Sequence, residues 1–220
     1  QRRAIDVFSY IKNNTPKDSI LYLRASAELI NNKYSRFEIE DLIEIAIVLK
    51  YDLSNCIQKI YDENNLTSQQ IRIAYSTCMN RIMMIYFLVG NYDLAKQYYD
   101  DYHKYHLSIP KCRYSSKYDS MLLEWDMDYA RGIGIQNPQM ALKLEKNCFK
   151  NFSAHIDYRR KTLSEIDIIF LQAILEKDYN NAIQELERLE NDLKKHGILS
   201  EAFKASIRKA YCHLLKYISI

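Results

Sequence analysis

The sequence is poor in the residues that interrupt regular secondary structure. Its 220 residues include only four glycines and three prolines, the residues that most often mark turns. An all-β protein of this length needs many turns, so the shortage excludes that class. Leu, Ile, Ala, Lys, Glu and Gln recur along the whole chain, and each is an adequate helix former. The composition therefore predicts an all-α protein with long helices joined by short loops.

The sequence also lacks a long apolar run, a large net charge and paired cysteines. The longest apolar stretch, around residues 82–89, is far shorter than the roughly 20 residues of a membrane-spanning helix. A net charge of +3 is too small to indicate nucleic-acid binding. The five cysteines are widely spaced, and Cys78 and Cys148 fall on apolar helical stripes, as small core residues do in a reducing compartment. We therefore expect a cytoplasmic protein with no membrane partner.

The sequence contains no short motif with a known catalytic or cofactor-binding mechanism. The glycine pair at 132–134 has no preceding strand and no third glycine, and Gly-Lys-Ser, Gly-Lys-Thr and His-Glu-x-x-His are missing. His103, His106 and Cys112 lie close together, but a fourth zinc ligand is not evident. We expect no enzyme, cofactor or metal site. A hydrolase assembled from distant residues remains a third functional alternative.

The most informative stretch that is present covers residues 82–102. It predicts the end of a buried helix, a tight turn at Gly90 and the start of a second helix, because glycine tolerates a positive φ. Ala95 is small where the two helices would cross most closely, and Tyr86 and Tyr99 would fill the space on either side. One such hairpin has little interior of its own, so hairpins stack and leave a concave surface.

The hairpin pattern recurs along the chain. Ala95, Ala141 and Ala182 occupy equivalent positions, at spacings of 46 residues (141 minus 95) and 41 residues (182 minus 141), longer than the roughly 34 of a regular tetratricopeptide (TPR) unit. The sequence predicts a right-handed superhelix of stacked antiparallel hairpins, a TPR-like solenoid, over residues 66–220, with a C-terminal capping helix. Residues 1–65 are predicted to form helices that pack on this solenoid.

Breaks and capping residues delimit the individual helices. Asp18 and Ser35 are predicted N-caps, Asn137 precedes a proline in a first turn, and Gly197 is a predicted C-cap. The predicted helices cover approximately residues 3–12, 18–31, 36–49, 53–61, 67–89, 92–105, 115–131, 138–148, 163–175, 178–195 and 200–217.

The candidate ligand site begins with Asn80, which lies in an otherwise apolar helix. Its amide has one acceptor and two donors, which can hold the backbone of an extended peptide. The alternative is a hydrogen bond to a neighbouring helix or loop, because a buried amide needs partners. Met84 and Phe87 follow one and two turns later. At the same offset from the repeat alanine, Asp167 and Leu171 correspond to Asn80 and Met84.

Trp125, the only tryptophan, lies in a helix with several acidic residues, including Asp128. Both a core position and a position lining the groove are open, because the indole is amphipathic. The complete set of predicted peptide-binding residues is Asn80, Met84, Phe87, Trp125, Asp128, Asp167 and Leu171.

The hairpin, the long repeats, the Tyr/Asn/Lys/Ile-rich composition and Asn80 resemble the TPR-like effector domains of peptide-sensing transcriptional regulators from Gram-positive bacteria and their phages. These include RNPP, Rgg-like and arbitrium-receptor-like regulators, and the resemblance covers about residues 67–220. It implies that asparagines of inner helices hold a short signalling peptide, and that a C-terminal helix helps a homodimer form. Asn80 is the one residue of this chain to which the family's peptide-holding role can be assigned directly. Asp167 departs from an asparagine pattern.

The same resemblance implies DNA binding through an N-terminal helix-turn-helix. Residues 1–60 lack the early helices and turn of such a domain. We therefore expect DNA contact only through a domain preceding Gln1, and the alternative is that the protein works without one. A peptide-sensing regulatory domain is therefore the first functional hypothesis. The alternative is a constitutive TPR-like scaffold for a protein partner.

Overall fold

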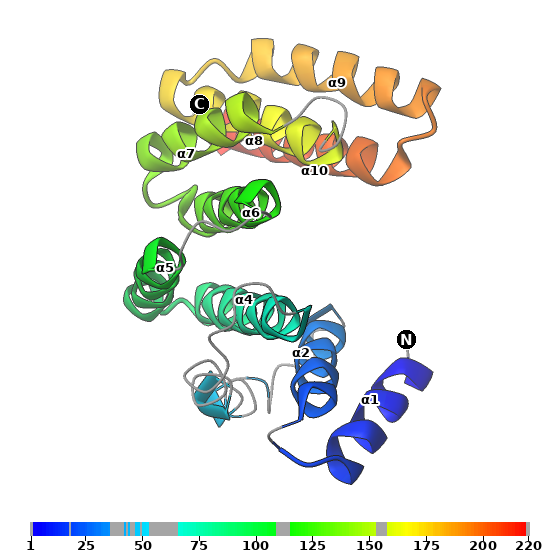
Figure 1. Cartoon of the computed structure of the whole chain (residues 1–220). Helices are drawn as coiled ribbons and strands as arrows, with labels where there is room; N and C mark the ends of the chain where they lie inside the picture. Colours follow the sequence, from blue (N-terminus) through cyan, green and yellow to red (C-terminus); the bar gives the residue numbers. More distant parts are fainter. Residues whose placement is uncertain are drawn as a thin grey trace. The chain divides into compact units, whose positions relative to one another are not determined.

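The structure, a computed structural model, describes residues 2–17, 19–35, 42, 44, 47, 48, 50–52, 66–108, 115–152 and 158–218. These residues contain helices and no strand, which confirms the predicted all-α class. Figure 1 labels the helices, whose bounds are α1 (Arg2–Asn14), α2 (Ile20–Ser35), α4 (Leu66–Leu88), α5 (Tyr92–Ser108), α6 (Ser115–Ile133), α7 (Pro138–Asn151), α8 (Tyr158–Glu176), α9 (Tyr179–Lys195) and α10 (Leu199–Ile218). None of these described helices is long and apolar enough to span a bilayer.

The chain forms two compact units, Gln1–Met121 and Leu122–Ile220. The division falls inside α6, which begins in the first unit and ends in the second. The predicted boundary after residue 65 lies in a segment outside the described residues, and it stays a prediction. The predicted helices near residues 36–49 and 53–61 also fall largely or wholly outside them.

In the first unit, α1 packs on α2, α2 packs on α4, and α4 packs on α5. The apolar side chains of α2 and α4 form its core, and Leu23, Ile30, Met79, Ile82 and Met83 are completely buried. The sequence of α4 is apolar on most of its surface because α2 and α5 both cover it. α2 and α4 therefore contact each other although residues 36–65 separate them in the sequence.

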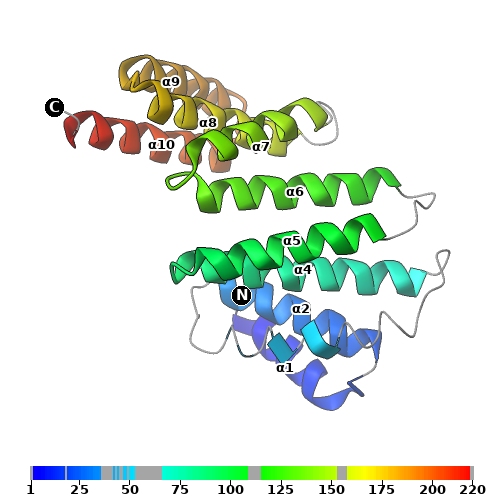
Figure 2. The same cartoon turned by 90° about the vertical axis from the view of Figure 1, so that its left-hand side faces the viewer.

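In the second unit, α8 contacts α7, α9 and α10, and α10 also contacts α9. Figures 1 and 2 show α10 beside both α8 and α9. Ile166 of α8, Leu186 and Leu193 of α9 and Cys212 of α10 are buried in this core. Cys148 is fully buried as well, which confirms its predicted core position. α8 is thus the central helix of the unit.

Two glycines end helices as predicted. Gly90 has a φ of 76° and Gly197 a φ of 72°, in the left-handed region that glycine adopts without a Cβ clash. In each case the following amide donates to a carbonyl five residues back, at 2.8 Å after Gly90 and 2.9 Å after Gly197. This is the pattern of a Schellman C-cap. The repeat alanines Ala95, Ala141 and Ala182 are all buried, as predicted.

The N-caps follow the sequence signals with small differences. The Asn137 side chain accepts from the Met140 amide at 3.1 Å, with Pro138 as the first helical residue. In α2 it is Ser19 whose hydroxyl accepts from Tyr22 N, whereas the predicted cap, Asp18, lies outside the described residues. α8 begins earlier than the predicted start near residue 163.

Candidate functional site

Three predicted peptide-binding residues lie on α4 in the first unit. Asn80 and Phe87 are buried, and Met84 is half-buried. Asn80 is 8 % exposed, so its amide presents little surface to a ligand in this conformation. A peptide clamp at Asn80 stays a prediction.

The other four predicted residues lie in the second unit. Trp125 and Leu171 are 2 % and 3 % exposed, so both side chains occupy core positions and have little surface available for a ligand. Asp128 on α6 is half-buried. Asp167 on α8 is buried, and it is the centre of a group of ion pairs.

Asp167 bridges two arginines from different helices. Its Oδ2 atom accepts from Arg131 Nε of α6 at 2.7 Å, and its Oδ1 atom accepts from Arg208 Nε of α10 at 2.8 Å. Arg208 Nη2 also lies 2.7 Å from Oδ1. We call Arg131, Glu145, Asp167 and Arg208 the Asp167 cluster. It joins four helices, because Glu145 belongs to α7.

Opposite charges in this cluster favour the ionised forms of Asp167 and Arg131. Burial alone would raise the pKa of the Asp167 carboxyl, but Arg131 and Arg208 lower that pKa below its ordinary value. Burial opposes the charge of Arg131, yet Asp167, Glu145 and Asp128 hold the pKa of its guanidinium above the ordinary value. Asp167 and Arg131 are therefore ionised at neutral pH.

Glu145 is the exception in the cluster. It is completely buried, and neither carboxyl oxygen makes a hydrogen bond of normal geometry to a described residue. Burial and the charge of Asp167 raise the pKa of Glu145 to about 8, while Arg131 and the Ser164 hydroxyl offset only part of this rise. Glu145 is therefore largely protonated at neutral pH.

A small cavity adjoins the Asp167 cluster. Its volume is about 220 Å³, and its walls come from α6, α8 and α10 of the second unit. It combines charged and branched apolar side chains, namely Arg131, Leu163, Ile166, Asp167, Lys204, Ile207 and Arg208. Of the predicted site residues, Asp167 is the one that lines it.

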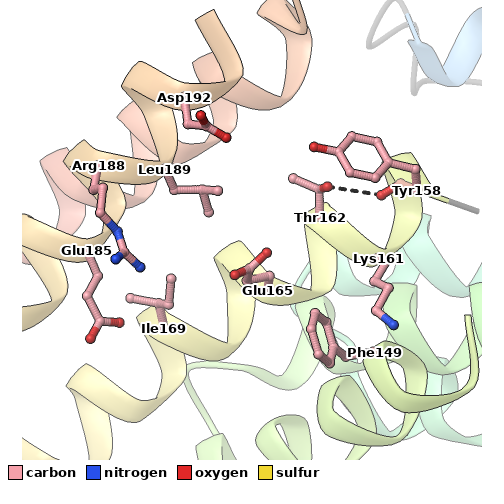
Figure 3. A pocket seen from close by; sticks show the side chains of 10 residues that line it. All are labelled: Phe149, Tyr158, Lys161, Thr162, Glu165, Ile169, Glu185, Arg188, Leu189 and Asp192. Carbon is pink, nitrogen blue, oxygen red and sulfur yellow. Dashed lines mark hydrogen bonds between the residues drawn. The ribbon is translucent and has the colours of Figure 1, made fainter. Parts of the chain in front are cut away.

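A larger groove lies between α7, α8 and α9. Its volume is about 640 Å³, and Figure 3 shows side chains of α8 and α9 around the open space. The lining residues combine aromatic, apolar and charged side chains, namely Phe149, Tyr158, Lys161, Thr162, Glu165, Ile169, Glu185, Arg188, Leu189 and Asp192. All of them belong to the second unit, and none was among the predicted site residues.

Charges of both signs line this groove above partly buried apolar residues. Ile169 and Leu189 pack against the core of the unit. Burial raises the pKa of Glu165, while the charge of Arg188 lowers it and that of Glu185 raises it. Lys161 Nζ lies 4.8 Å from the centre of the Phe149 ring. The groove can therefore accept a ligand with apolar groups and charges of either sign.

No group of three His, Cys, Asp or Glu side chains among the described residues could hold a metal ion. His103 lies against Tyr99, with ring centroids 4.3 Å apart, and Cys112 lies outside the described residues. The buried thiols of Cys78 and Cys148 have raised pKa values because burial disfavours the thiolate.

The sequence did contain a signal for the Asp167 cluster. Glu145 lies between Ala141 and Cys148 on the buried face of α7, and Asp167 lies between Ile166 and Phe170 on the buried face of α8. An acidic residue on an apolar helical stripe predicts a buried partner of opposite charge. Spacing alone could not identify Arg131 or Arg208 as those partners, because they lie 36 and 41 residues from Asp167.

No protein-family model matches this chain, and no curated protein or solved structure matches it either. The resemblance to peptide-sensing regulators therefore rests on the chain's own residues.

Proposed function

We propose that this chain is a peptide-binding regulatory domain whose second unit holds a short peptide in the α7–α8–α9 groove. The groove itself is the observation that carries this proposal. Its volume of about 640 Å³ falls in the range of roughly 300–1,000 Å³ that ligand sites occupy. A compact volume of this kind suits a few peptide residues rather than a folded protein.

The lining of the groove supports a peptide as the ligand. Ile169 and Leu189 offer apolar contact for side chains, and Lys161, Arg188 and Glu165 offer donors and acceptors for backbone groups and termini. Figure 3 shows these groups distributed over two facing helices. A peptide lying along the groove would contact both helices at once.

Regulation requires that the peptide bind two conformations with different affinity. α8 contributes to both the groove and the Asp167 cluster, so a peptide that changes the packing of α8 against α9 also changes the geometry of the cluster. The superhelical arrangement, the homodimer and the control of a DNA-binding domain belong to this proposal through the family resemblance. Contacts between α2 and α4 and between α8 and α10 support stacked hairpins.

Affinity selection from a pool of synthetic penta- to octapeptides tests the proposal. Mass spectrometry would identify the retained peptides, and calorimetry would measure their affinity. Leu189→Ala should weaken binding about tenfold, because it removes apolar contact from the groove. Leu199→Ala is the matched control, since Leu199 is exposed on α10 and does not line the groove.

The same experiment distinguishes peptide binding at Asn80 from peptide binding in the α7–α8–α9 groove. If Asn80→Ala abolishes peptide binding and Leu189→Ala does not, the peptide binds on the first unit and the groove assignment is wrong. If no peptide is retained by the wild-type chain, the sensor proposal fails.

A second candidate, the protein-interaction scaffold, is favoured by an exposed stripe on α10. Phe203, Ile207, Tyr211, Leu214 and Ile218 are all exposed and share one helical face. The opposite face of α10 is buried in the unit. A helix that is apolar on both sides normally has a partner on each.

The occupant that fits this stripe is an acidic amphipathic helix. Lys204, His213 and Lys216 are exposed on α10, and its one acidic residue, Glu201, is buried and paired with Arg159. Two copies of such a basic helix would repel each other, whereas an acidic helix would complement it.

Fluorescence anisotropy with a labelled Leu/Glu amphipathic helical peptide would test this candidate. Phe203→Lys should abolish binding, and Ile135→Lys, at an exposed apolar residue outside α10, should not. Self-association of the chain that Phe203→Lys removes would instead assign the stripe to a second copy.

A further inference from the structure

The small cavity beside the Asp167 cluster has an excess of positive charge. Three of its lining side chains are cationic, Arg131, Lys204 and Arg208, and one, Asp167, is anionic. Asp167 already accepts from both arginines. The cavity therefore has N–H donors on cationic side chains that do not bind the Asp167 carboxylate.

Lys204 supplies most of these donors. It has no hydrogen bond or ion pair with any described residue, and it lines the cavity beside Arg131 and Arg208. Lys204 is only partly shielded from solvent, and this shielding, together with the charge of Arg131, lowers the pKa of its ammonium group. Arg208 binds Asp167 through Nε and Nη2, and its Cζ atom lies 4.5 Å from the centre of the Phe170 ring. Its Nη1 atom makes no hydrogen bond to Asp167.

We propose that this cavity is a binding site for a carboxylate attached to a short apolar group. Lys204 and Arg208 would donate to the carboxylate, while Leu163 and Ile207 would contact the apolar group. A volume of about 220 Å³ admits a branched side chain of the size of leucine and excludes a long ligand. Asp128 Oδ1 lies 3.5 Å from Arg131 Nη1 and offsets part of the excess positive charge of the cavity. A ligand with a single negative charge therefore matches the cavity better than a dianionic phosphate.

The carboxylate site is distinct from the peptide groove. On α8, Glu165 and Ile169 face the groove, whereas Leu163 and Asp167 line the cavity. The 100° rotation per residue of an α-helix places these pairs on roughly opposite sides. The carboxylate site therefore goes beyond the proposed function and can exist whether or not the groove binds a peptide.

Two sources could supply such a carboxylate, a free branched-chain acid or the C-terminal residue of a peptide. NMR titration of the full chain would distinguish them, with backbone amides of Lys204 and Arg208 as reporters. The probes are isovalerate, its neutral isostere isovaleramide, and N-acetyl-Ala-Leu as the free acid and as the amide.

Both acids, or the peptide acid alone, should produce saturable shifts, and the amides should not. Lys204→Met keeps the aliphatic stem and should weaken acid binding about tenfold. Lys216→Met, an exposed residue on the same helix, should leave binding unchanged. Binding of isovalerate indicates a free acid as the source, and binding of the peptide acid alone indicates a C-terminus. Equal binding of acid and amide, unchanged binding to Lys204→Met, or no saturable shift with either acid would overturn the proposal.

Discussion

The Oε1 atom of Glu145 lies 4.0 Å from Arg131 Nε, a separation too long for a hydrogen bond. The same Nε atom donates to Asp167 at 2.7 Å instead. Two buried carboxyl groups thus share one guanidinium, and the geometry favours Asp167. At neutral pH Asp167 is therefore ionised and Glu145 is protonated, because the pKa of Asp167 is lowered and that of Glu145 is raised.

The raised pKa of Glu145 predicts that stability falls as pH rises. Its pKa is 4.5 in a model compound and about 8 in the folded chain, so the unfolded chain loses this proton first. The contribution of protonated Glu145 to the free energy of unfolding is complete below pH 4.5. It is lost as pH rises to about 8, at up to about 1.4 kcal/mol per pH unit. Urea unfolding between pH 5 and 8 measures this slope.

Glu145→Gln should flatten that pH dependence, because glutamine is a neutral isostere of the protonated acid. Glu176→Gln, at an exposed residue at the end of α8, should retain the wild-type slope. Identical slopes for the wild type and Glu145→Gln would show that Glu145 does not titrate in this range.

Asp167→Asn should be strongly destabilising. It leaves Arg131 and Arg208 without their shared carboxylate, and removing one partner of a buried ion pair costs about 3–5 kcal/mol. The free energy of unfolding from urea titration is the measurement. Asp192→Asn provides the control, because the Asp192 side chain is 59 % exposed and its loss should change stability by less than about 0.5 kcal/mol. A loss below about 1 kcal/mol for Asp167→Asn would mean that Glu145 takes its place.

The local elements of this fold were predictable because their signals are local. Gly90, Gly197 and Asn137 each fix a helix end through hydrogen bonds within a few residues. The buried positions of Ala95 and Cys148 follow from helical periodicity. Such features depend on one turn of chain, which a sequence displays directly.

The candidate sites were not predictable in the same way. The groove depends on which faces of α7, α8 and α9 stay uncovered, and the sequence does not give the rotation of one helix against another. Trp125 illustrates the limit, because its sequence context left a core position and a groove-lining position open, and contacts between helices bury its side chain. The position of a side chain depends on contacts between helices, and those contacts join residues far apart in the chain.

Gly90→Ala and Gly197→Ala should destabilise the chain by similar amounts. Both residues have a positive φ, and a Cβ atom at either would meet no atom within 4 Å. Only the backbone conformation is therefore unfavourable, at about 1–2 kcal/mol for an L-residue. Thermal and urea unfolding of the two variants measure the effect. Gly90→Asn should lose less stability than Gly90→Ala, because asparagine tolerates a positive φ better than alanine does. An alanine variant as stable as the wild type would show that the turn rearranges.

Arg188→Glu should change which peptides the groove selects. Two cationic and three anionic side chains line the groove, for a local charge of −1 (2 minus 3), and the variant has one and four, for −3 (1 minus 4). Peptides rich in lysine and arginine should therefore gain affinity, and acidic peptides should lose it, by about tenfold at low salt. Affinity selection from the same synthetic pool measures this change.

The control for that exchange is Lys216→Glu. Lys216 is exposed in the last turn of α10 and does not line the groove, so both variants change the net charge of the chain equally. Because exposed charges are screened within about 10 Å at 0.1 M salt, only Arg188→Glu should alter selection at that ionic strength. An equal shift in both variants would mean that overall charge, and not the groove, determines which peptides bind.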